Sequence, residues 1–434
     1  MRSPRIDSPQ TAPAGAAGVP QVRGGLARYV VAATLARSAD GGAVVAIILL
    51  VTTSGSPGWM AGLLGACITA PHLFGPFVAR CLDTARDGRT VISLACMAHG
   101  VTLAAAVLVY PVAWPAVTGI LLVASGLVGP LLTGGISSRL PAIAGPERSS
   151  QRRAQGWDVA TYGIGGTIGP SVVAAASAWA GPAVAALLLA GATFAAAAVI
   201  RLLPFSPPAA VASDVPRPAQ TLGMMFSTGP LRRTLYMTVI VALSVAVLPI
   251  TAVASTGELG IAPAAAGAIT AAYGLGGLAG SAGVMIRPLR ADADRLMTWL
   301  AAGVGAALVG AALAGSFPAA VVTYAIAGIL NSYFFAATLA ARSEYAPLEA
   351  RGQVFVWVGA LKITAGSAGT ALGGAAVSLA THLPLFVAVA AIMAAVGASV
   401  LDRGRERALH EQGHEQGPAG ASGQHRLDAA GVAR

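Results

Sequence analysis

The sequence predicts an all-α membrane protein with twelve transmembrane helices in two pseudo-symmetric six-helix bundles. Three observations lead to this prediction. Hydrophobic residues make up 56% of the 434 residues and charged residues only 10%, whereas a soluble protein carries roughly 25% charged residues. The apolar residues form twelve long runs, and the basic residues gather in every second connection between them. This composition excludes an ordinary soluble protein.

Each apolar run is long enough to cross a bilayer, which takes ~20 residues of helix. The runs lack the alternation of polar and apolar residues that a membrane β-strand requires. Pro, Gly or Arg residues bound them. The predicted spans are residues 27–51, 58–79, 90–110, 114–138, 156–178, 182–203, 232–253, 263–286, 295–314, 318–340, 353–379 and 384–401.

The arginines predict the orientation of these spans, because cytoplasmic loops retain positive charge. Arginines precede the first run, occupy every even-numbered connection and follow the last run. Arg342 and Arg351 are assigned to the connection after the tenth span. No Arg or Lys occurs in the intervening connections near residues 52–57, 111–113, 180, 254–262, 315–317 and 381–383. Both termini are therefore predicted to be cytoplasmic in a multi-pass plasma-membrane protein, and the net charge of +10 indicates orientation rather than a nucleic-acid partner.

A proline-rich connection divides the chain into halves of six spans each. The predicted units are a disordered cytoplasmic tail at 1–25, a first bundle at 26–203, a cytoplasmic central loop at 204–231, a second bundle at 232–402 and a disordered cytoplasmic tail at 403–434. Parallel halves of this kind are typical of transporters. Glycines four residues apart predict close packing of helices. They are the pairs Gly165/Gly169, Gly276/Gly280 and Gly369/Gly373.

The connection after the second span contains Gly75, then Asp83, then the pair Gly88-Arg89. This spacing resembles the cytoplasmic signature of the major facilitator superfamily, although no Arg directly follows Asp83. The resemblance implies that Gly75 lets the second and eleventh helices approach closely. It also implies that the Asp83 carboxylate meets the positive N-terminal end of the eleventh helix. We therefore expect Gly75, Asp83 and Arg89 to form a cytoplasmic latch against that helix, the alternative being an ordinary basic turn.

The fifth span contains Gly156, Gly165 and the pair Gly169-Pro170, with Asp158 one turn from its start. This pattern resembles the antiporter signature of the same superfamily, although the chain has Val and Ala where the signature ends in a Gly pair. The resemblance favours an exporter over an importer. The alternative is a glycine-rich helix that serves packing alone. The fourth span lacks the Arg that drug/proton antiporters of the superfamily often carry.

Ionisable residues at membrane depth are the candidate substrate and proton pathway, because such groups usually face a cavity and pair. Arg37 and Asp40 lie near the middle of the first span, and Lys362, the only lysine, lies in the eleventh. Arg37 and Asp40 either neutralise each other locally or serve function, and Asp40 and Lys362 are expected to approach across the cavity in some states. Asp158 is expected to pair with arginines at the cytoplasmic end.

The function predicted from these features is secondary active transport by alternating access, most simply proton-coupled efflux of a small organic compound by a monomeric bacterial protein. Uptake of a nutrient is one alternative, and a receptor without flux is another. No enzyme activity, cofactor or metal is expected. The zinc-protease-like string His410–His414 lies in a repetitive polar tail, and the three cysteines match no metal site.

Overall fold

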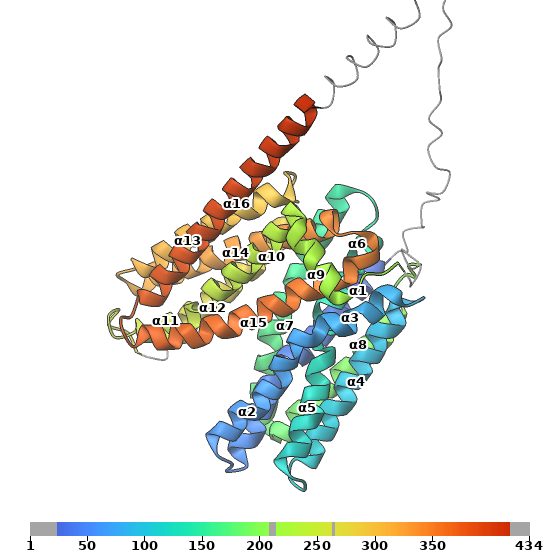
Figure 1. Ribbon diagram of the computed structural model, residues 1–434. Coiled ribbons are helices and arrows are strands. Elements are labelled where there is room, and N and C mark those ends of the chain that lie inside the picture. The colour runs from blue at the N-terminus through green and yellow to red at the C-terminus, as the bar shows by residue number, and fades with distance from the viewer. Residues whose placement is uncertain (1–23, 208–213, 263–264, 417–434) are drawn as a thin grey trace, which may run out of the picture.

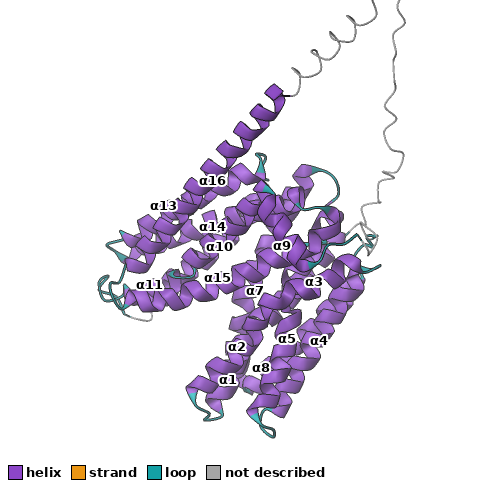
Figure 2. Ribbon diagram, viewed as in Figure 1, coloured by secondary structure: helices purple, strands orange, loops and turns teal. Residues whose placement is uncertain are grey.

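The computed structural model describes residues 24–207, 214–262 and 265–416, and these residues form helices and loops without a strand (Figure 2). Within them, twelve helical segments are long and apolar enough to cross a membrane. The predicted number of spans is therefore confirmed. The predicted N-terminal tail, apart from its last two residues, and residues 417–434 of the C-terminal tail lie outside the described residues, as do the side chains of the His410–His414 string.

The first bundle holds six spans, two of which are built from several helical pieces. The second span joins α2, the 3-10 turn η1 and α3, and the fourth joins α5, the π-helical turn η2 and α6. The elements are α1 (Gly25–Thr53), α2 (Gly58–Thr69), η1 (Ala70–Phe74), α3 (Gly75–Thr84), α4 (Gly88–Val109), α5 (Pro115–Pro130), η2 (Leu131–Gly135), α6 (Leu140–Ala144), α7 (Arg148–Ala180) and α8 (Pro182–Arg201).

The second bundle follows the connecting helix α9 and again holds six spans. The seventh span joins α10 and α11, and the eleventh joins the short turn η4 to α15. The elements are α9 (Pro218–Ser227), α10 (Gly229–Val245), α11 (Leu248–Ala254), α12 (Ala266–Ile286), α13 (Ala293–Ala312), α14 (Phe317–Tyr345), η4 (Leu348–Ala350), α15 (Arg351–Val377) and α16 (Leu383–Gln416).

Several boundaries differ from those predicted; α7, for example, begins at Arg148 and not at residue 156. Helix α9 occupies much of the segment predicted as a central loop, and α14 continues past residue 340 to Tyr345. Helix α16 continues past the predicted end at 402 to Gln416. At the start of this extension Arg233 Nη1 on α10 pairs with Asp402 and Glu406, which lie on successive turns of α16, at 2.8 Å to each.

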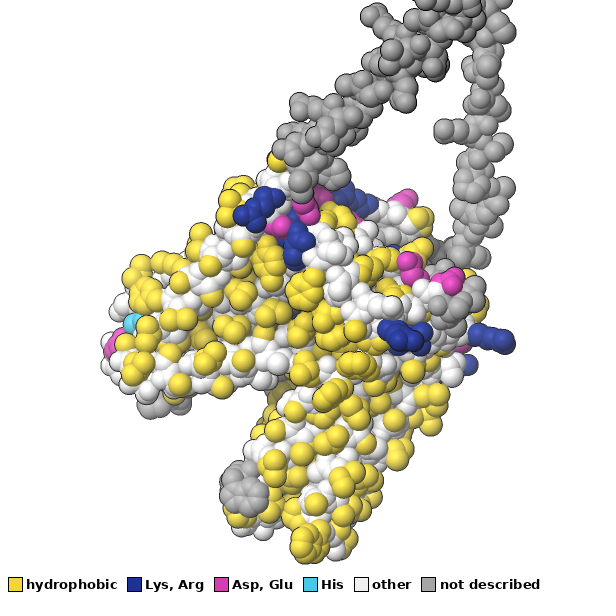
Figure 3. All heavy atoms as spheres, viewed as in Figure 1, with side chains coloured by type: hydrophobic (Ala, Val, Ile, Leu, Met, Phe, Trp, Pro, Cys, Tyr) yellow, Lys and Arg dark blue, Asp and Glu magenta, His cyan; other side chains and the backbone are white. Residues whose placement is uncertain are grey.

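The two bundles meet at one end and diverge at the other, so that the molecule has the shape of a V (Figures 1 and 3). We call these the closed end and the open end. Connections rich in Arg surround the closed end, where α3 and η2 contact α15 and where α7 contacts α12 and α14. The outer faces of both arms are largely hydrophobic (Figure 3), as a lipid-facing surface requires.

Small residues let corresponding helices of the two bundles pack with their backbones in contact. A Cβ atom on Gly169 of α7 would meet the Ser38 carbonyl oxygen of α1, and one on Gly369 of α15 would meet the Leu243 carbonyl oxygen of α10. In each bundle the fifth span thus packs on the first in the same way. Gly276 of α12 likewise lies on the backbone of α14. The predicted role of these glycines in packing is confirmed.

Replacing Gly169 by Ala is expected to lower the thermal stability of the purified protein, because the added Cβ meets the Ser38 carbonyl and pushes α1 from α7. Gly191 on α8 provides the control, since a Cβ there meets nothing within 4 Å. Gly191→Ala should be neutral or stabilising, because alanine is favoured over glycine within a helix by ~1 kcal/mol. Equal melting temperatures for both variants in detergent would contradict this account of the packing.

Candidate functional site

A buried ion pair lies at the centre of the first bundle. Arg37 of α1 donates from Nη1 to Asp158 Oδ1 of α7 at 2.7 Å, and both side chains are at most 2% exposed. Tyr29 donates its hydroxyl to Asp158 Oδ1 at 2.5 Å, and Ser137 donates to Asp158 Oδ2 at 2.8 Å. The second guanidinium nitrogen reaches Ser137 and the Thr133 carbonyl at the π-helical turn. One carboxylate therefore fixes three spans around Arg37.

A second polar group lies beside this pair on the same helix. Asp40 Oδ1 is 3.5 Å from Nε2 of His72 in η1. His72 Nδ1 lies 3.0 Å from the Ile68 carbonyl oxygen, which can only accept, so Nδ1 carries a hydrogen. Nε2 then either accepts a proton or, in the charged ring, donates toward Asp40. Asp40 and His72 are thus two ionisable groups 3.5 Å apart at the edge of the cavity described next, without a hydrogen bond between them.

The two bundles enclose a central cavity of about 180 Å³ at the point where they converge. Residues from both bundles line it: Arg37, Asp40, Gly41, Thr133, Tyr162 and Gly166 from the first, and Phe335, Arg342, Gly359, Lys362 and Ile363 from the second. The Arg37 guanidinium stacks 3.6 Å from the centre of the Tyr162 ring. The predicted pathway residues Arg37, Asp40 and Lys362 thus lie in one cavity.

The pairing of these residues differs from the prediction for Asp158 and from one of the two alternatives left open for Arg37 and Asp40. Arg37 does not pair with Asp40 but with Asp158, and Asp158 does not pair with the arginines at its own end of the helix. The cause is the close approach of α1 and α7, which places the two side chains together across helices. Asp40 and Lys362 line the same cavity, yet the described residues show no ion pair between them. Their approach in another state stays a prediction.

Arg342, which was predicted to lie in the connection after the tenth span, is a cavity residue. It lies inside α14, is 1% exposed, and stacks near the rings of Phe335 and Phe355, with its guanidinium 5.7 and 5.5 Å from their centres. Its Nη2 donates to Thr338 at 3.0 Å. Arg342 follows Phe335 by seven residues, or two helical turns, so continuing the helical pattern past 340 would have placed both on one face.

The signature residues after the second span lie at the closed end. Asp83 of α3 accepts hydrogen bonds from the backbone N–H groups of Gly352 and Gln353, at 2.9 and 2.8 Å, at the start of α15. Gly75 lies against Pro130, and a Cβ there would also approach Val356 of α15. Contacts of this kind place a carboxylate on the positive end of a helix, as the resemblance implied.

Arg89 does not join these contacts. It pairs with Asp87, with 2.9 Å between Nη2 and Oδ2, and donates to the Leu203 carbonyl at 2.8 Å, so it stays within the first bundle. The hydrogen bonds from Arg89 hold the pKa of Asp87 below its usual value. The Arg139 guanidinium lies against Gly88, where it would meet an added Cβ. The expected contact of Arg89 with the eleventh helix was therefore wrong.

A second link across the closed end was not predicted. Arg152 of α7 donates to Glu344 of α14 at 2.9 Å and to the Ala291 carbonyl oxygen at 3.3 Å. Arg148, one turn earlier, lies 3.4 Å from the same Glu344 carboxylate. Arg152 is 2% exposed although it was assigned to a connection. We refer to the Asp83 contacts and the Arg152–Glu344 pair together as the closed-end contacts.

The fifth-span residues have separate positions. Gly165 and Gly169 pack on α1, and Pro170 lies inside α7. Gly156 lies near the closed end, where a Cβ would meet Met285 and Val284 of α12. Gly165 and Gly169 let α7 approach α1 closely, and Gly156 lets α7 approach α12 of the other bundle. The glycines of the motif therefore serve packing within the first bundle and between the bundles.

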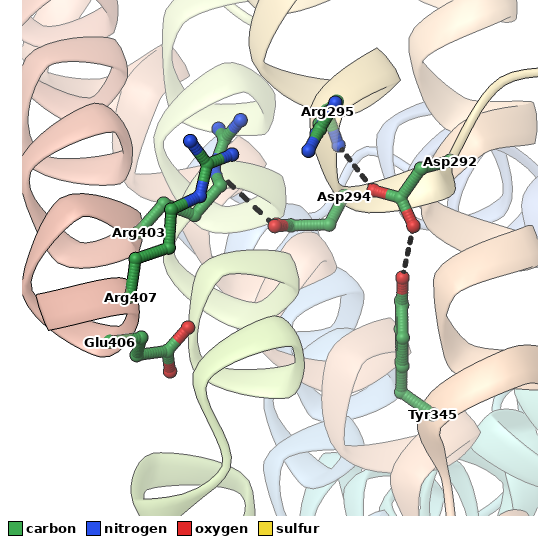
Figure 4. Close-up of a pocket in the computed structure, with 7 residues that line it drawn as sticks. All are labelled: Asp292, Asp294, Arg295, Tyr345, Arg403, Glu406 and Arg407. Atoms are coloured by element: carbon green, nitrogen blue, oxygen red, sulfur yellow. Dashed lines mark hydrogen bonds and ion pairs between the residues drawn. The ribbon is translucent and has the colours of Figure 1, made fainter. Parts of the chain in front are cut away.

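A separate charged cluster lies at the closed end of the second bundle around a depression of about 500 Å³ (Figure 4). Asp292 accepts from the Tyr345 hydroxyl at 2.5 Å and caps α13 at the Arg295 N–H. Partial burial raises the pKa of Asp292, but these hydrogen bonds outweigh it and the pKa lies below its usual value. Asp294 faces Arg403 of α16 at 3.4 Å. These contacts join helices of one bundle.

Comparison with known proteins identifies the fold. The sequence matches no family model and no curated protein. The structure is similar to a bacterial homologue of the iron transporter ferroportin in its outward-facing state, with a TM-score of 0.72 and 14% identity over 88% of this chain and 99% of that one. It is also similar to the human organic anion transporter MFSD10 (TETRAN), with a TM-score of 0.66 and 14% identity over 86% and 99% of the two chains.

A third similar structure is the major facilitator superfamily transporter FucP in its outward conformation, with a TM-score of 0.64 and 13% identity over 86% of this chain and 98% of that one. The protein is a multi-pass membrane protein with the fold of the major facilitator superfamily. At these identities the comparisons establish the fold alone.

Replacing Asp158 by Asn is expected to destabilise the protein strongly, because it leaves the buried Arg37 charge without its partner. Breaking a buried pair by removing one member costs ~3–5 kcal/mol. The double variant Arg37→Gln/Asp158→Asn removes both charges and should lose less stability than the sum of the two single variants. Thermal unfolding of all four proteins in detergent measures this, and strictly additive losses would contradict the pair.

Proposed function

We propose that this protein is a secondary transporter that works by alternating access, with its termini and closed end in the cytoplasm. The observation that carries the proposal is the central cavity, which holds Arg37, Asp40, Arg342 and Lys362 at the convergence of two bundles. Charged side chains at membrane depth are costly and mark substrate or ion pathways. The concentration of arginines at the closed end supports the orientation.

The closed-end contacts fit the role of a reversible gate. They are few, and the Asp83 carboxylate on the α15 end contributes ~0.3–1 kcal/mol, rising to ~2 kcal/mol in partly buried geometry. A ligand shifts the equilibrium between two states by its differential affinity for them. Because the gate contacts contribute so little free energy, the binding of a ligand can open them. Rocking of the bundles would break these contacts and open the cavity toward the cytoplasm.

We propose that transport is coupled to protons and exports a small organic compound. The position of the Asp40 carboxylate in the cavity, 3.5 Å from the ionisable ring of His72, supports coupling, and the antiporter-like pattern of the fifth span favours export. Uptake by the same machinery is the alternative within transport. A receptor on this fold is the alternative of another class, and it requires no opening of the closed end.

Alternating access can be tested without knowing the substrate. Gly359 lines the cavity, and a Cβ there meets nothing within 4 Å, so Gly359→Cys introduces a thiol without a clash. In a variant lacking Cys67, Cys81 and Cys96, a membrane-impermeant maleimide should label this thiol from both sides of the membrane. Labelling is compared in right-side-out and inverted vesicles. Reaction from the outer side alone would refute transport and favour a receptor.

Asp83→Asn in this background is expected to speed labelling from the cytoplasmic side, because the neutral amide no longer stabilises the start of α15. The ratio of cytoplasmic to outer labelling should rise roughly two- to thirty-fold. Asp87→Asn is the matched control, since it removes a carboxylate from the same end whose partners, Arg89 and Arg201, belong to the same bundle. An equal effect of both variants would contradict the gate.

Asp40→Asn is expected to remove the pH dependence of the same labelling ratio, because it deletes a proton-binding carboxylate beside His72. The labelling rates from the cytoplasmic and the outer side depend in the same way on ionisation of the thiol. Their ratio at a given pH therefore does not contain that ionisation. Arg405→Gln, which changes an exposed charge far along α16, should leave the pH dependence intact. An unchanged pH profile in Asp40→Asn would place proton coupling elsewhere.

A further inference from the structure

Two cations in the central cavity lack an acidic partner. Lys362 of α15 lies with Nζ 3.5 Å from the centre of the Phe335 ring and 5.3 Å from that of Tyr162. The described residues offer it no ion pair and no hydrogen bond. An aromatic face attracts a cation but leaves its charge uncancelled, so the ammonium group can still bind an anion.

Arg342 is the second such cation. Its guanidinium donates one hydrogen bond, to the Thr338 hydroxyl, and pairs with no carboxylate among the described residues. Its buried Nε atom has no partner. A guanidinium has five N–H donors in a planar fork that matches a carboxylate. Most of the hydrogen-bonding capacity of Arg342 is therefore unused beside an open cavity.

Neither nearby carboxylate pairs with these cations among the described residues. Asp158 accepts hydrogen bonds from Arg37, Tyr29 and Ser137. Asp40 lines the cavity from the first bundle, 3.5 Å from His72 Nε2, and its buried Oδ1 makes no hydrogen bond. With Arg37 neutralised by Asp158, the second-bundle side of the cavity carries two positive charges that its own residues do not balance. Uncompensated charge at membrane depth is energetically costly, and a bound anion would offset that cost.

We propose that the central cavity binds a small organic carboxylate, with its charged group between Arg342 and Lys362. The rest of the lining includes Phe335, Tyr162 and Ile363, whose apolar or aromatic surface suits a hydrocarbon or aromatic body, and the first bundle adds the polar side chains of Arg37, Asp40 and Thr133. The cavity of about 180 Å³ is several times the ~30 Å³ that one water occupies in the liquid, so it has room for a small organic ion. The claim that such a carboxylate is the transported substrate rests on the proposed function. The claim that the cavity binds it does not.

The second bundle supplies both cations, whereas Tyr162, Arg37 and Asp40 come from the first. A carboxylate held by Arg342 and Lys362 therefore lies against residues of both bundles. A ligand that contacts both sides of a hinge acts on the equilibrium between states by its differential contacts. Uncompensated charges at the convergence of the bundles let a bound anion contact both of them, which charges within one bundle would not.

The test uses the purified full-length Gly359→Cys protein, without its other cysteines, in nanodiscs. Benzoate, salicylate and phenylacetate are added as probes, and the rate of thiol alkylation is measured. Benzamide, the neutral analogue of benzoate, and benzylamine, a cation, are the matched controls, with sodium chloride at equal ionic strength. The carboxylates are expected to slow alkylation saturably, while benzamide and benzylamine do not.

Lys362→Gln and Arg342→Gln should each raise the carboxylate concentration needed for half-protection roughly tenfold or more, because each removes a charge-assisted contact. Lys362→Arg and Arg342→Lys retain the charge and should recover part of the effect, which keeps the test valid if a Gln variant folds poorly. Arg405→Gln should match the parent protein.

Equal protection by benzamide, protection by chloride alone, no protection by any of the three carboxylates, or unchanged protection in the charge-removing variants would each overturn the proposal. The binding test and the two-sided labelling test fail separately. Protection without two-sided access would refute transport and retain the anion site. Two-sided access without protection would refute the anion site and retain transport.

Discussion

The ion pair between Arg37 and Asp158 is the contact on which the rest of the central cavity depends. It joins α1 to α7 through two almost fully buried charges, and Ser137 extends it to the fourth span. Asp158 gives its hydrogen bonds to Arg37, Tyr29 and Ser137, and among the described residues it makes no ion pair with Arg342 or Lys362 of the second bundle. The same pair holds Arg37 against Tyr162, whose ring forms part of the cavity wall. The Arg37–Asp158 pair thus affects both the packing of these helices and the distribution of charge around the cavity.

The closed end illustrates how a membrane protein can hold two bundles together weakly. Within each bundle, helices pack backbone to backbone at glycines such as Gly169 and Gly369, which gives rigid units. Between the bundles, the polar contacts at the closed end include Asp83 on the start of α15 and Arg152 with Glu344, and apolar side chains such as Val159 and Phe335 pack there as well. The Glu344 side chain is 25% exposed, whereas that of Arg152 is 2% exposed. Rocking of the bundles would require these contacts to break while the bundles themselves stay rigid.

The sequence predicted the fold well because the bilayer imposes simple rules. Span length, basic connections and glycine spacing are local features, and all twelve spans follow from them. The contact of Asp83 with α15 followed from a local spacing that resembles a known signature. Partners of buried charges could not be predicted in the same way. Arg37 and Asp158 are far apart in sequence, and nothing local to α1 specifies which helix lies against it. Arg342 was missed because the apolar run ends before the helix does.

The central claim is that two rigid bundles alternate about the cavity, and distances between spin labels test it most directly. One pair of labels spans the open end at Trp114 and Leu379, which are 81% and 80% exposed. The other spans the closed end at Arg86 and Leu348, which are both exposed. Pulsed electron paramagnetic resonance in nanodiscs should detect two populations at each end. The account predicts that conditions which shorten the Trp114–Leu379 distance lengthen the Arg86–Leu348 distance. Single, unchanging distances at both ends under all conditions would contradict it.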